Sequence, residues 1–496
     1  MTDMYKPTLK TIQKLANRGN IAPIYKEISA GHETPTSIYS KIANQPYSFL
    51  LESATANKTS GRFSFIGTEP IKIIAEQEKK QNPLIEIQNT LKNYQLIDIE
   101  NTQRFSGGFV GYLSYDAIKN FEIIPEHQND PLKLPEYIFM LCTTFVSFDH
   151  KLKIIRITSL VDLQENIEKS YSEACKKIDE IISKINNTKI KPPKEKNSKS
   201  INKNLLPEKP SSNISKKEYF SMVDRAKKYI YDGEIIQAVI SQRFSKKISV
   251  DPLKIYESLK KINPSPYMYY LDLGDFHIVG SSPEMLVRLE NGEISTNPIA
   301  GTSPRGKTKI EDDSIAQELQ SDEKEVAEHT MLLDLGRNDL GRVSIPGTVK
   351  VSKLMKVDRY SHVMHLVSEV KGQLVAGLNS SDVLKACFPA GTVSGAPKVR
   401  AMEIISELEK DKRGPYAGAI GYFDFQGNMD TAISIRTLVI KDGTAHVQAG
   451  GGIVHDSIPE KEYMETIHKS SAVIKAIEEA EIQSLQKESK NDIDNR

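Results

Sequence analysis

The chain has 496 residues, of which 39% are hydrophobic and 26% are charged, a composition typical of a globular protein large enough for two domains. Its 66 Lys and Arg almost cancel its 65 Asp and Glu, so no global field favours nucleic acid or an anionic membrane. There is no run of membrane-spanning length, no secretory signal pattern near the start, and no paired spacing of the three cysteines. We therefore expect a cytoplasmic protein without a disulfide framework or zinc site.

The first part of the chain combines strand and helix patterns. Alternating apolar residues at 109–113 and 154–157 predict strands, and residues 166–186 have helical spacing with a polar outer face. These patterns predict an N-terminal domain over residues 1–185.

A polar segment separates this domain from the rest. Residues 186–213 hold seven Lys, four Pro and six Asn but only four aliphatic side chains, too few to bury. Basic runs also occur in nucleic-acid arms, but this run has no interleaved aromatic residues and belongs to a neutral chain. It is predicted to be a linker or a long exposed loop.

The second part opens with a helix signal, because Ser215 and Glu218 form a capping-box pattern before an apolar stripe. Turn residues between apolar runs predict an antiparallel meander of three strands. The expected elements are a strand at 236–244, a helix from 397 to before 414, the meander at 417–454, and a helix over about 459–480. We expect a second domain at 214–480, a polar tail at 481–496, and an α+β class with antiparallel sheet flanked by helices.

Two carboxylate segments draw attention. Glu465 shares one face of the last predicted helix with Glu462 and Lys469, a pattern that by itself is typical of a solvated surface. Glu328 belongs to a stretch in which charges alternate with core-type aliphatic residues. Because Mg²⁺ is held by one or two carboxylates together with water and substrate oxygens, two glutamates from separate helices would suit it.

Small-residue loops form the next group, at 298–302, 389–398 and 448–452. Such loops let backbone N–H groups approach an anion, although ordinary turns explain most glycine clusters. Arg436, twenty residues after Tyr416, is a natural bidentate partner for a carboxylate, or alternatively a surface arginine on a strand. Together these segments suggest a small polyanionic substrate bridged by a metal.

In combination, these segments resemble the chorismate-binding enzymes, the family of anthranilate, aminodeoxychorismate, isochorismate and salicylate synthases. The resemblance covers most of residues 214–480, in the expected order. The matching motifs lie at 233–243, 280–284, 298–302, 327–329, 335–343, 388–398 and 465–469. It implies the anthranilate synthase type of fold, an antiparallel β-sandwich flanked by helices.

The resemblance also implies roles for individual residues. Glu328 and Glu465 would bind Mg²⁺, which holds one carboxylate of chorismate. Glu284 would be the acid for the departing C4 hydroxyl, since burial can raise the pKa of a carboxyl group, and His365 and Thr392 would assist turnover. The residues expected around the substrate are Gly301, Thr302, Tyr416, Arg436, Gly450, Gly451 and Gly452.

Two positions choose among the members of this family. Gln237 occupies the position at which the water-adding members of the family share a lysine base. Ala300 occupies the position at which aminodeoxychorismate synthases have a nucleophilic lysine. Neither residue can perform that chemistry. The resemblance therefore favours attack of external ammonia at C2, followed by loss of pyruvate to give anthranilate.

Partners and regulation follow from the same resemblance. No cysteine has the setting of a glutamine amidotransferase nucleophile, so a separate glutaminase subunit is expected to channel ammonia, in a heterotetramer of two large and two small subunits. Residues 50–53 and 61–67 resemble a tryptophan feedback pocket, with Ser53, Pro266, Tyr267 and Met268 contacting the inhibitor. Alternatively, these strands only build a core between the domains.

Some positions depart from the family pattern, namely Ile236, Val326, Gly451 and His468, and they affect the shape of the pocket rather than a catalytic group. One alternative is an aminodeoxychorismate synthase component, which Ala300 disfavours. Another is a non-catalytic, tryptophan-responsive binding protein of the same fold, which the presence of Glu284, Glu328 and Glu465 disfavours.

Overall fold

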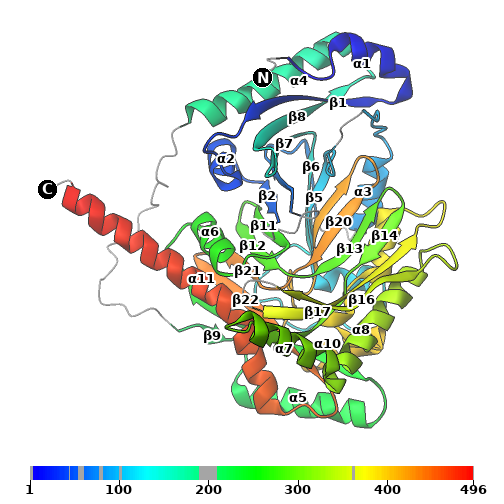
Figure 1. The fold of residues 1–496 in the computed structure, drawn as a ribbon, viewed down its shortest axis with the longest axis vertical. Helices are drawn as coiled ribbons and strands as arrows, with labels where there is room; N and C mark the ends of the chain where they lie inside the picture. Colours follow the sequence, from blue (N-terminus) through cyan, green and yellow to red (C-terminus); the bar gives the residue numbers. More distant parts are fainter. Residues whose placement is uncertain are drawn as a thin grey trace.

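The computed structural model describes residues 4–43, 45–53, 61–76, 82–99, 103–188, 209–359 and 363–494. Within these ranges, two antiparallel sheets of twelve and ten strands form a sandwich with helices around it (Figure 1). The predicted α+β class is confirmed. Of the predicted linker, residues 189–208 lie outside the described part of the chain.

The first sheet, sheet A, contains strands from both parts of the chain. In spatial order they are β1 (Ile21–Ser29), β8 (Ile154–Asp162), β7 (Thr144–Asp149), β3 (Phe63–Gly67), β2 (Ser48–Glu52), β11 (Tyr267–Asp272), β12 (Phe276–Ser282), β21 (Thr437–Lys441), β22 (Thr444–Ile453), β10 (Gln237–Lys247) and β18 (Gly395–Ala396), with β9 (Ser211–Ser212) also paired to β10. Leu50 of β2 pairs with Tyr270 of β11, so the parts before and after residues 189–208 form one continuous sheet.

Sheet B is mixed in the same way. Its order is β15 (Ile299–Pro304), β17 (Val363–Gln373), β14 (Glu293–Thr296), β13 (Met285–Glu290), β20 (Met429–Ile433), β19 (Ala419–Asp424), β5 (Gly108–Leu113), β6 (Tyr137–Cys142) and β4 (Lys72–Ala75), with β16 (Lys350–Arg359) also paired to β17. Tyr112 of β5 pairs with Ile420 of β19. Each sheet is therefore completed by strands that are more than 200 positions apart in the sequence.

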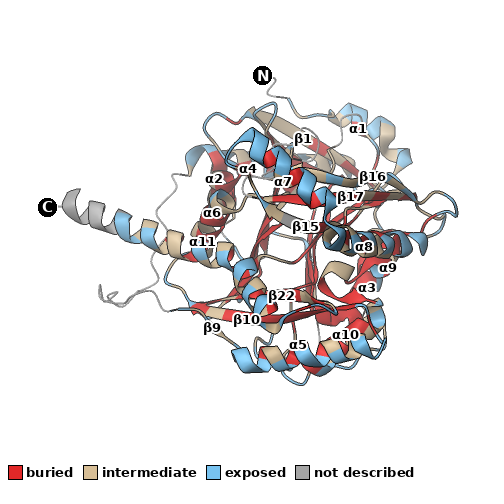
Figure 2. Cartoon of the chain, turned by 60° about the horizontal axis from the view of Figure 1, so that its bottom comes forward, coloured by how far each residue is buried: buried red, intermediate tan, exposed pale blue. Residues whose placement is uncertain are grey.

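Helices cover the outer faces of the sandwich. They are α1 (Leu9–Leu15), α2 (Pro35–Ile42), α3 (Pro83–Leu91), α4 (Ile167–Asn187), α5 (Lys216–Tyr231), α6 (Pro252–Ile262), α7 (Lys309–Ser321), α8 (Glu323–Gly341), α9 (Ser380–Cys387), α10 (Lys398–Leu408) and α11 (Pro459–Asp494), with short 3₁₀ turns η1 (Ala16–Arg18), η2 (Tyr115–Asn120) and η3 (Gly391–Val393). Figure 2 shows α5 and α10 with exposed outer faces and buried faces toward the sheet. In the described residues, no helix is long and apolar enough to cross a membrane.

The core between the sheets is aromatic. Phe105 lies at its centre, with ring centroids 4.9 Å from Phe145 and 5.0 Å from Tyr422. Such edge and tilted ring contacts add to the stabilisation that burial of the rings provides. Because Phe145 belongs to sheet A and Tyr422 to sheet B, this cluster joins the two layers.

Most predicted elements are present, including the capping box of Ser215 and Glu218 at the start of α5. The predicted meander at 417–454 was wrong in one respect. It contains four strands, and the chain leaves sheet B after β20 and enters sheet A at β21. Arg436, expected in mid-strand, lies in this crossover with a φ of 51°. The alternation of apolar residues did not reveal the crossover because both faces of these strands are buried.

Two helices also differ in length from their predictions. The helix from Pro397 ends at Leu408, and Glu409 to Arg413 form an irregular segment instead of a further turn. The last helix continues from Pro459 to Asp494, through the predicted polar tail. A polar sequence can extend a helix whose apolar stripe is already anchored, because Lys, Glu and Gln have good helix propensity.

Candidate active site

Two adjacent crossovers between the sheets carry functional side chains. Pro283 and Glu284 connect β12 of sheet A to β13 of sheet B, and residues 434–436 connect β20 to β21 in the opposite direction. The N–H of Ile433 donates to the Glu284 carbonyl at 3.1 Å. This bond ties the crossover that carries Glu284 to the end of β20, just before the crossover that carries Arg436, although 152 positions separate the two residues in the sequence.

Glu284 lies in a nearly closed environment, with 7% of its surface exposed. Burial raises the pKa of its carboxyl group to about 8, against the opposing effects of the Thr392 hydroxyl, the Ile299 N–H and the Lys469 ammonium. This carboxyl group therefore carries a proton at neutral pH. It is equipped to act as an acid.

Arg436 is half-buried and differs from the paired arginines of the core. Burial lowers the pKa of its guanidinium, and no ion pair joins it to a carboxylate in the described part of the chain. Arg413, by comparison, is bound to Glu409 at 2.6 Å. A desolvated guanidinium without a protein partner is suited to an anionic ligand.

His365 is the third candidate residue and lies on β17. Its Nδ1 is 3.1 Å from the Gly301 carbonyl oxygen, and because a carbonyl only accepts, Nδ1 is the protonated nitrogen. Burial lowers the pKa of His365 to about 4, the Gly301 carbonyl opposes this shift and the charge of Arg436 adds to it. The ring is therefore neutral at physiological pH, with Nε2 as its basic nitrogen.

The strand that contains Gly301 is irregular at this point. The pairing of β15 with β17 shifts register between Ala300 and Thr302, and Gly301 adopts a φ of 67°. A bulge of this kind redirects the strand and is favoured by glycine in the left-handed region. Thr302 is placed here by its pairing with His365.

The glycines of β22 form another wall. Gly450, Gly451 and Gly452 pair with β10 on one side, whereas pairing with β21 stops at Val447. The Gly450 N–H lies against the Tyr416 hydroxyl, and a Cβ on Gly450 would come within 2.8 Å of that oxygen. Beyond Val447, this edge of β22 therefore has no neighbouring strand of sheet A within the described residues.

Glu328 and Glu465 approach each other from α8 and α11. Burial raises the pKa of Glu328, and the Glu465 carboxylate adds to the rise while Lys469 opposes it. Lys469 Nζ is 2.6 Å from Glu465 Oε1 and 3.0 Å from the Gly450 oxygen. Through Lys469, the two glutamates are linked electrostatically to Glu284 and structurally to the glycine wall.

Glu328 and Glu465 are the candidate ligands for a metal ion. In the described ranges, no group of three or more His, Cys, Asp or Glu side chains has metal-binding geometry. Two mutually repelling, half-buried glutamates nevertheless suit Mg²⁺, which keeps several water or substrate ligands and requires only one or two carboxylates. The donor set of Glu328 and Glu465 therefore fits a magnesium ion, with Glu325 and Glu462 beside it as further carboxylates.

Sequence reasoning missed the support beneath Tyr416. Arg413 is fully buried, donates to Glu409 and to the carbonyls of Val393 and Val239, and lies 5.6 Å from the Tyr416 ring centre. The Glu409 carboxylate also accepts hydrogen bonds from the N–H and hydroxyl of Ser241. The only signal in the sequence was a Glu and Arg four positions apart, which usually indicates an exposed helical pair.

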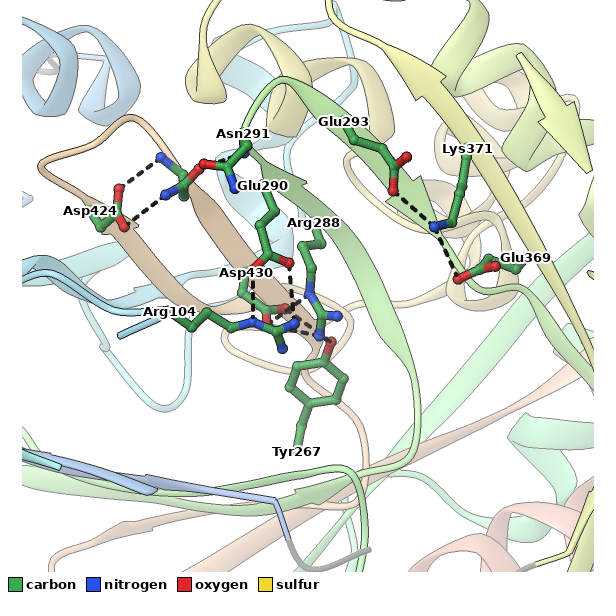
Figure 3. A network of polar contacts seen from close by, with 11 residues as sticks. Arg104, Tyr267, Arg288, Glu290, Asn291, Glu293, Glu369, Lys371, Asp424 and Asp430 are labelled. Atoms are coloured by element: carbon green, nitrogen blue, oxygen red, sulfur yellow. Dashed lines mark hydrogen bonds and ion pairs between the residues drawn. The ribbon is translucent and has the colours of Figure 1, made fainter. Parts of the chain in front are cut away.

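A separate cavity of about 800 Å³ lies between the sheets and is lined by Ser53, Pro266, Tyr267 and Met268. Figure 3 shows its polar wall, where Arg288 is bound to Asp430 and Arg104 to Glu290. The Tyr267 hydroxyl donates to Asp430 at 2.9 Å. The structure thus gathers the four residues predicted to bind tryptophan in one cavity, distinct from the site of Glu284 and Arg436.

The comparisons with known proteins agree with this geometry. Residues 46–475 match the model of the chorismate binding enzyme family. The chain belongs to the chorismate-binding enzyme family. It is 46% identical to anthranilate synthase component 1 of Acetivibrio thermocellus, over 96% of this chain and 99% of that protein. It is 44% identical to the protein of the same name from Aquifex aeolicus, over 96% and 98% of the two chains.

A solved member of the family has the same fold. The crystal structure of anthranilate synthase component I from Streptococcus pneumoniae superposes with a TM-score of 0.72 at 36% identity, covering 90% of this chain and 98% of that one. The resemblance found in the sequence is confirmed. In the present chain, the family match includes residues on both sides of 189–208. This agrees with the two sheets, which contain strands from both sides.

Proposed function

We propose that this protein is the large subunit of an anthranilate synthase and converts chorismate and ammonia into anthranilate, pyruvate and water. The observation that carries the proposal is a buried, protonated carboxyl group on one crossover and, on the adjacent crossover, a half-buried arginine that forms no ion pair within the described residues. Chorismate has two carboxylates and a hydroxyl leaving group. It therefore requires both an anion site and an acid.

Arg436 binds the enolpyruvyl carboxylate in this proposal, with help from the N–H groups of Gly451 and Gly452, since the Gly450 N–H already contacts the Tyr416 hydroxyl. The guanidinium and the amides are already in place before the substrate arrives, so little reorganisation is needed. Tyr416, held by the Arg413 and Glu409 pair, supports the glycine strand from behind. Gly301 and Thr302 complete the wall beside His365.

Glu328 and Glu465 would hold Mg²⁺. An ion held there would supply positive charge to neutralise and orient the second carboxylate of chorismate. Lys469 shares this charged region, since its ammonium contacts Glu465 and lowers the pKa of Glu284 and Glu328. These residues place the ring carboxylate close to the acid.

Glu284 donates its proton to the departing C4 hydroxyl, which leaves as water. Ammonia forms the new C–N bond at C2, and the resulting ammonium group loses one proton. A carboxylic acid with a pKa near 8 is protonated at neutral pH and still a competent donor. Thr392, whose hydroxyl lies beside this carboxyl group, orients it.

The second step removes pyruvate and makes the ring aromatic. It requires loss of the C2 proton and protonation of the enolpyruvyl group as its C–O bond breaks. We assign His365 to this step, because its neutral ring presents Nε2 as a base while the Gly301 carbonyl fixes the tautomer.

The nucleophile is chosen by Gln237 and Ala300. Gln237 is 3% exposed at the start of β10, and its amide oxygen has no hydrogen-bond partner in the described residues. It cannot activate water as a base, although it can accept a hydrogen bond from ammonia. Ala300 is buried in β15 and cannot form a covalent amine adduct.

One assay tests the proposal. The full chain is incubated with chorismate, Mg²⁺ and ammonium at alkaline pH, and anthranilate fluorescence and pyruvate are measured together. We expect equal amounts of both products. Absence of turnover would contradict the enzymatic proposal, and an aminated product without pyruvate would identify an aminodeoxychorismate synthase instead.

In the cell, we expect the ammonia to come from a glutaminase subunit. Of the three cysteines, Cys142 and Cys387 are buried, and burial raises the pKa of both thiols. Neither is suited to nucleophilic attack on glutamine. With glutamine in place of ammonium, activity should appear only after the partner subunit is added.

The cavity between the sheets is proposed to bind tryptophan as a feedback inhibitor. Three side-chain atoms of its lining, Ser53 Oγ, Gln103 Oε1 and Asn297 Oδ1, are buried without a hydrogen-bond partner in the described part. Its arginines are already paired with carboxylates. Such a cavity favours a zwitterionic amino acid over a dianion such as chorismate.

Ser53→Phe tests this regulatory role. The added ring would occupy the cavity, so the tryptophan concentration for half inhibition should rise at least about ten-fold. The kcat measured without tryptophan should change less than twofold. A Ser321→Phe variant, altered at an exposed position of α7, serves as the control. Unchanged inhibition in folded Ser53→Phe would contradict the assignment.

A further inference from the structure

A second, much smaller cavity is lined by the proposed acid, Glu284. Its volume is about 40 Å³, and its lining includes Glu284, Thr392 and, from α8, Asp339. A cavity needs roughly 10–15 Å³ of this measure to contain one water molecule, together with two to four polar partners. This one has room for one to three waters and has polar groups on different walls.

The polar groups of the cavity are incompletely satisfied by the protein. Thr392 Oγ1 is buried and makes no hydrogen bond of normal geometry within the described residues, although it is close enough to Glu284 to lower the pKa of that carboxyl group. A buried hydroxyl without a partner costs about 1–3 kcal/mol. A cavity water that hydrogen-bonds to Thr392 Oγ1 would remove this cost.

Asp339 connects the cavity to a lysine. Lys398 Nζ lies 2.7 Å from Asp339 Oδ2 and 3.3 Å from the Cys387 carbonyl oxygen. The Asp339 side chain is 11% exposed and that of Lys398 is 13% exposed, so the pair reaches from the cavity towards the surface. These residues belong to the motifs at 335–343 and 388–398, and the proposed chemistry gives neither of them a role.

The proposed reaction leaves one proton to be returned. Glu284 gives its proton to the C4 hydroxyl, which departs as water, and the carboxyl group becomes a carboxylate. The amine formed at C2 releases one proton, so the overall balance is zero. Glu284 must recover a proton before the next turnover, yet only 7% of its surface is exposed, and bound chorismate would cover the side that faces the substrate.

We propose that water in this small cavity returns the proton to Glu284, and that Asp339 and Lys398 form the gate through which the cavity exchanges protons with solvent. The inference rests on the proposed function, because it assigns Glu284 as the acid. Asp339 and Lys398 are positioning residues here, since they act on Glu284 through water and do not touch the substrate.

The surroundings of both carboxyl groups support this path. Glu284 faces Thr392 of η3, the Ile299 N–H of β15 and Lys469 of α11. Burial raises the pKa of Asp339, and Lys398 and Arg342 oppose the rise. The thiol of Cys387 is also close to Asp339, but burial keeps it protonated, so it does not compete for the exchanged proton.

The first test removes the gate. Asp339→Asn in the full chain is assayed with chorismate, Mg²⁺ and ammonium, and kcat, KM and the solvent deuterium isotope effect are measured across pH. We expect kcat to fall about ten-fold, within the range of proton-transfer effects, with KM for chorismate changed less than twofold. The isotope effect should increase as proton return becomes rate-limiting.

A second variant guards against misfolding. Gly336 lines the cavity from within α8, and a Cβ there would meet Thr296 Cγ2 at 3.3 Å and otherwise little. Gly336→Ala should keep or improve stability, because alanine favours helix, while its methyl group displaces cavity water. We expect a fall in kcat of at least about five-fold and an increased isotope effect. Gly341→Ala in the same helix, with nothing within 4 Å, should keep both.

The outcomes are separable. If the wild type makes no anthranilate, the proposed function itself is wrong, and not only the proton relay through the cavity water to Glu284. If the wild type is active and both Asp339→Asn and Gly336→Ala keep its kcat, pH profile and isotope effect, the relay is overturned. A loss of thermal stability in Asp339→Asn without any change in the isotope effect would also overturn it, since it indicates a structural pair only.

Discussion

The main-chain N–H of Ser281 donates to the main-chain oxygen of Arg436 at 3.2 Å. This bond ties the end of β12 to the residue that enters β21, where both strands leave or join sheet A. It fixes the two crossovers relative to each other. Glu284 and Arg436, the proposed acid and the proposed anion-binding residue, are therefore positioned by backbone pairing and not by contacts between their own side chains.

Arg436→Gln should separate binding from stability. Loss of the guanidinium should reduce kcat/KM for chorismate about 100- to 1,000-fold, the effect of roughly 3–4 kcal/mol. The unfolding temperature should stay the same or rise, because the change removes a buried charge that has no ion-pair partner in the described chain. Steady-state kinetics and thermal unfolding measure the two effects. A destabilised variant would indicate that Arg436 is structural.

Arg413→Gln provides the contrast. Here the substitution leaves Glu409 buried without its partner, 2.6 Å away in the wild type. We expect a loss of about 3–5 kcal/mol in the free energy of unfolding, measured by urea denaturation. The double variant Arg413→Gln, Glu409→Gln should recover part of the loss, because no unpaired charge remains. Additive losses in the double variant would contradict this coupling.

Glu284→Gln should abolish turnover while improving stability at alkaline pH. The folded state raises the pKa of Glu284 from its ordinary value to about 8, so between these values the folded protein binds a proton that the unfolded chain has released. Stability contributed by this proton is complete below the unfolded pKa and declines as pH rises to about 8. The Gln variant lacks this decline.

Two measurements check this behaviour. The free energy of unfolding should decrease more between pH 6 and pH 9 for the wild type than for the variant. At pH 9 the variant should be more stable by about 1–4 kcal/mol. The kcat of the wild type should fall as pH increases beyond about 8, where the acid loses its proton. Equal pH dependence of stability in the two proteins would show that Glu284 is already ionised in the fold.

Glu328→Gln should remove the response to magnesium. Burial and the Glu465 carboxylate raise the pKa of Glu328, so without metal its ionisation destabilises the fold as pH increases. Mg²⁺ should increase the unfolding temperature of the wild type by binding the native state. The variant should need at least about a ten-fold higher Mg²⁺ concentration for the same increase. Thermal unfolding with and without Mg²⁺ tests this independently of activity. An unchanged response would place the metal elsewhere.

Gly450→Ala should damage the substrate wall. The added Cβ would lie 2.8 Å from the Tyr416 hydroxyl and 3.1 Å from the Ile240 carbonyl oxygen, and the latter belongs to the backbone and cannot easily move. We expect KM for chorismate to increase about ten-fold, with a smaller change in kcat. The free energy of unfolding should decrease by about 1–3 kcal/mol. Kinetics identical to those of wild type would exclude this strand from the site.

The sequence named candidate residues more readily than it predicted their arrangement. Family-like motifs singled out Glu284, His365 and Arg436 as candidates because residue type and order are directly readable along a chain. The crossover at Arg436 escaped prediction, since buried strands on either side of it show the same continuous apolar pattern whether they stay in one sheet or change sheets. The length of α11 escaped for a related reason, because a polar continuation carries no stop signal.

The sequence by itself determined the chemistry available: Gln237 and Ala300 exclude a lysine base or nucleophile, and Glu328 and Glu465 supply carboxylates for a hard cation. Only the tertiary structure decided the electrostatics. Burial converts Glu284 into an acid with a pKa of about 8, holds His365 neutral and leaves Arg436 desolvated, because these effects depend on what distant strands bring around each group. The pair of Asp339 and Lys398, 59 positions apart, becomes visible only when α8 and α10 meet.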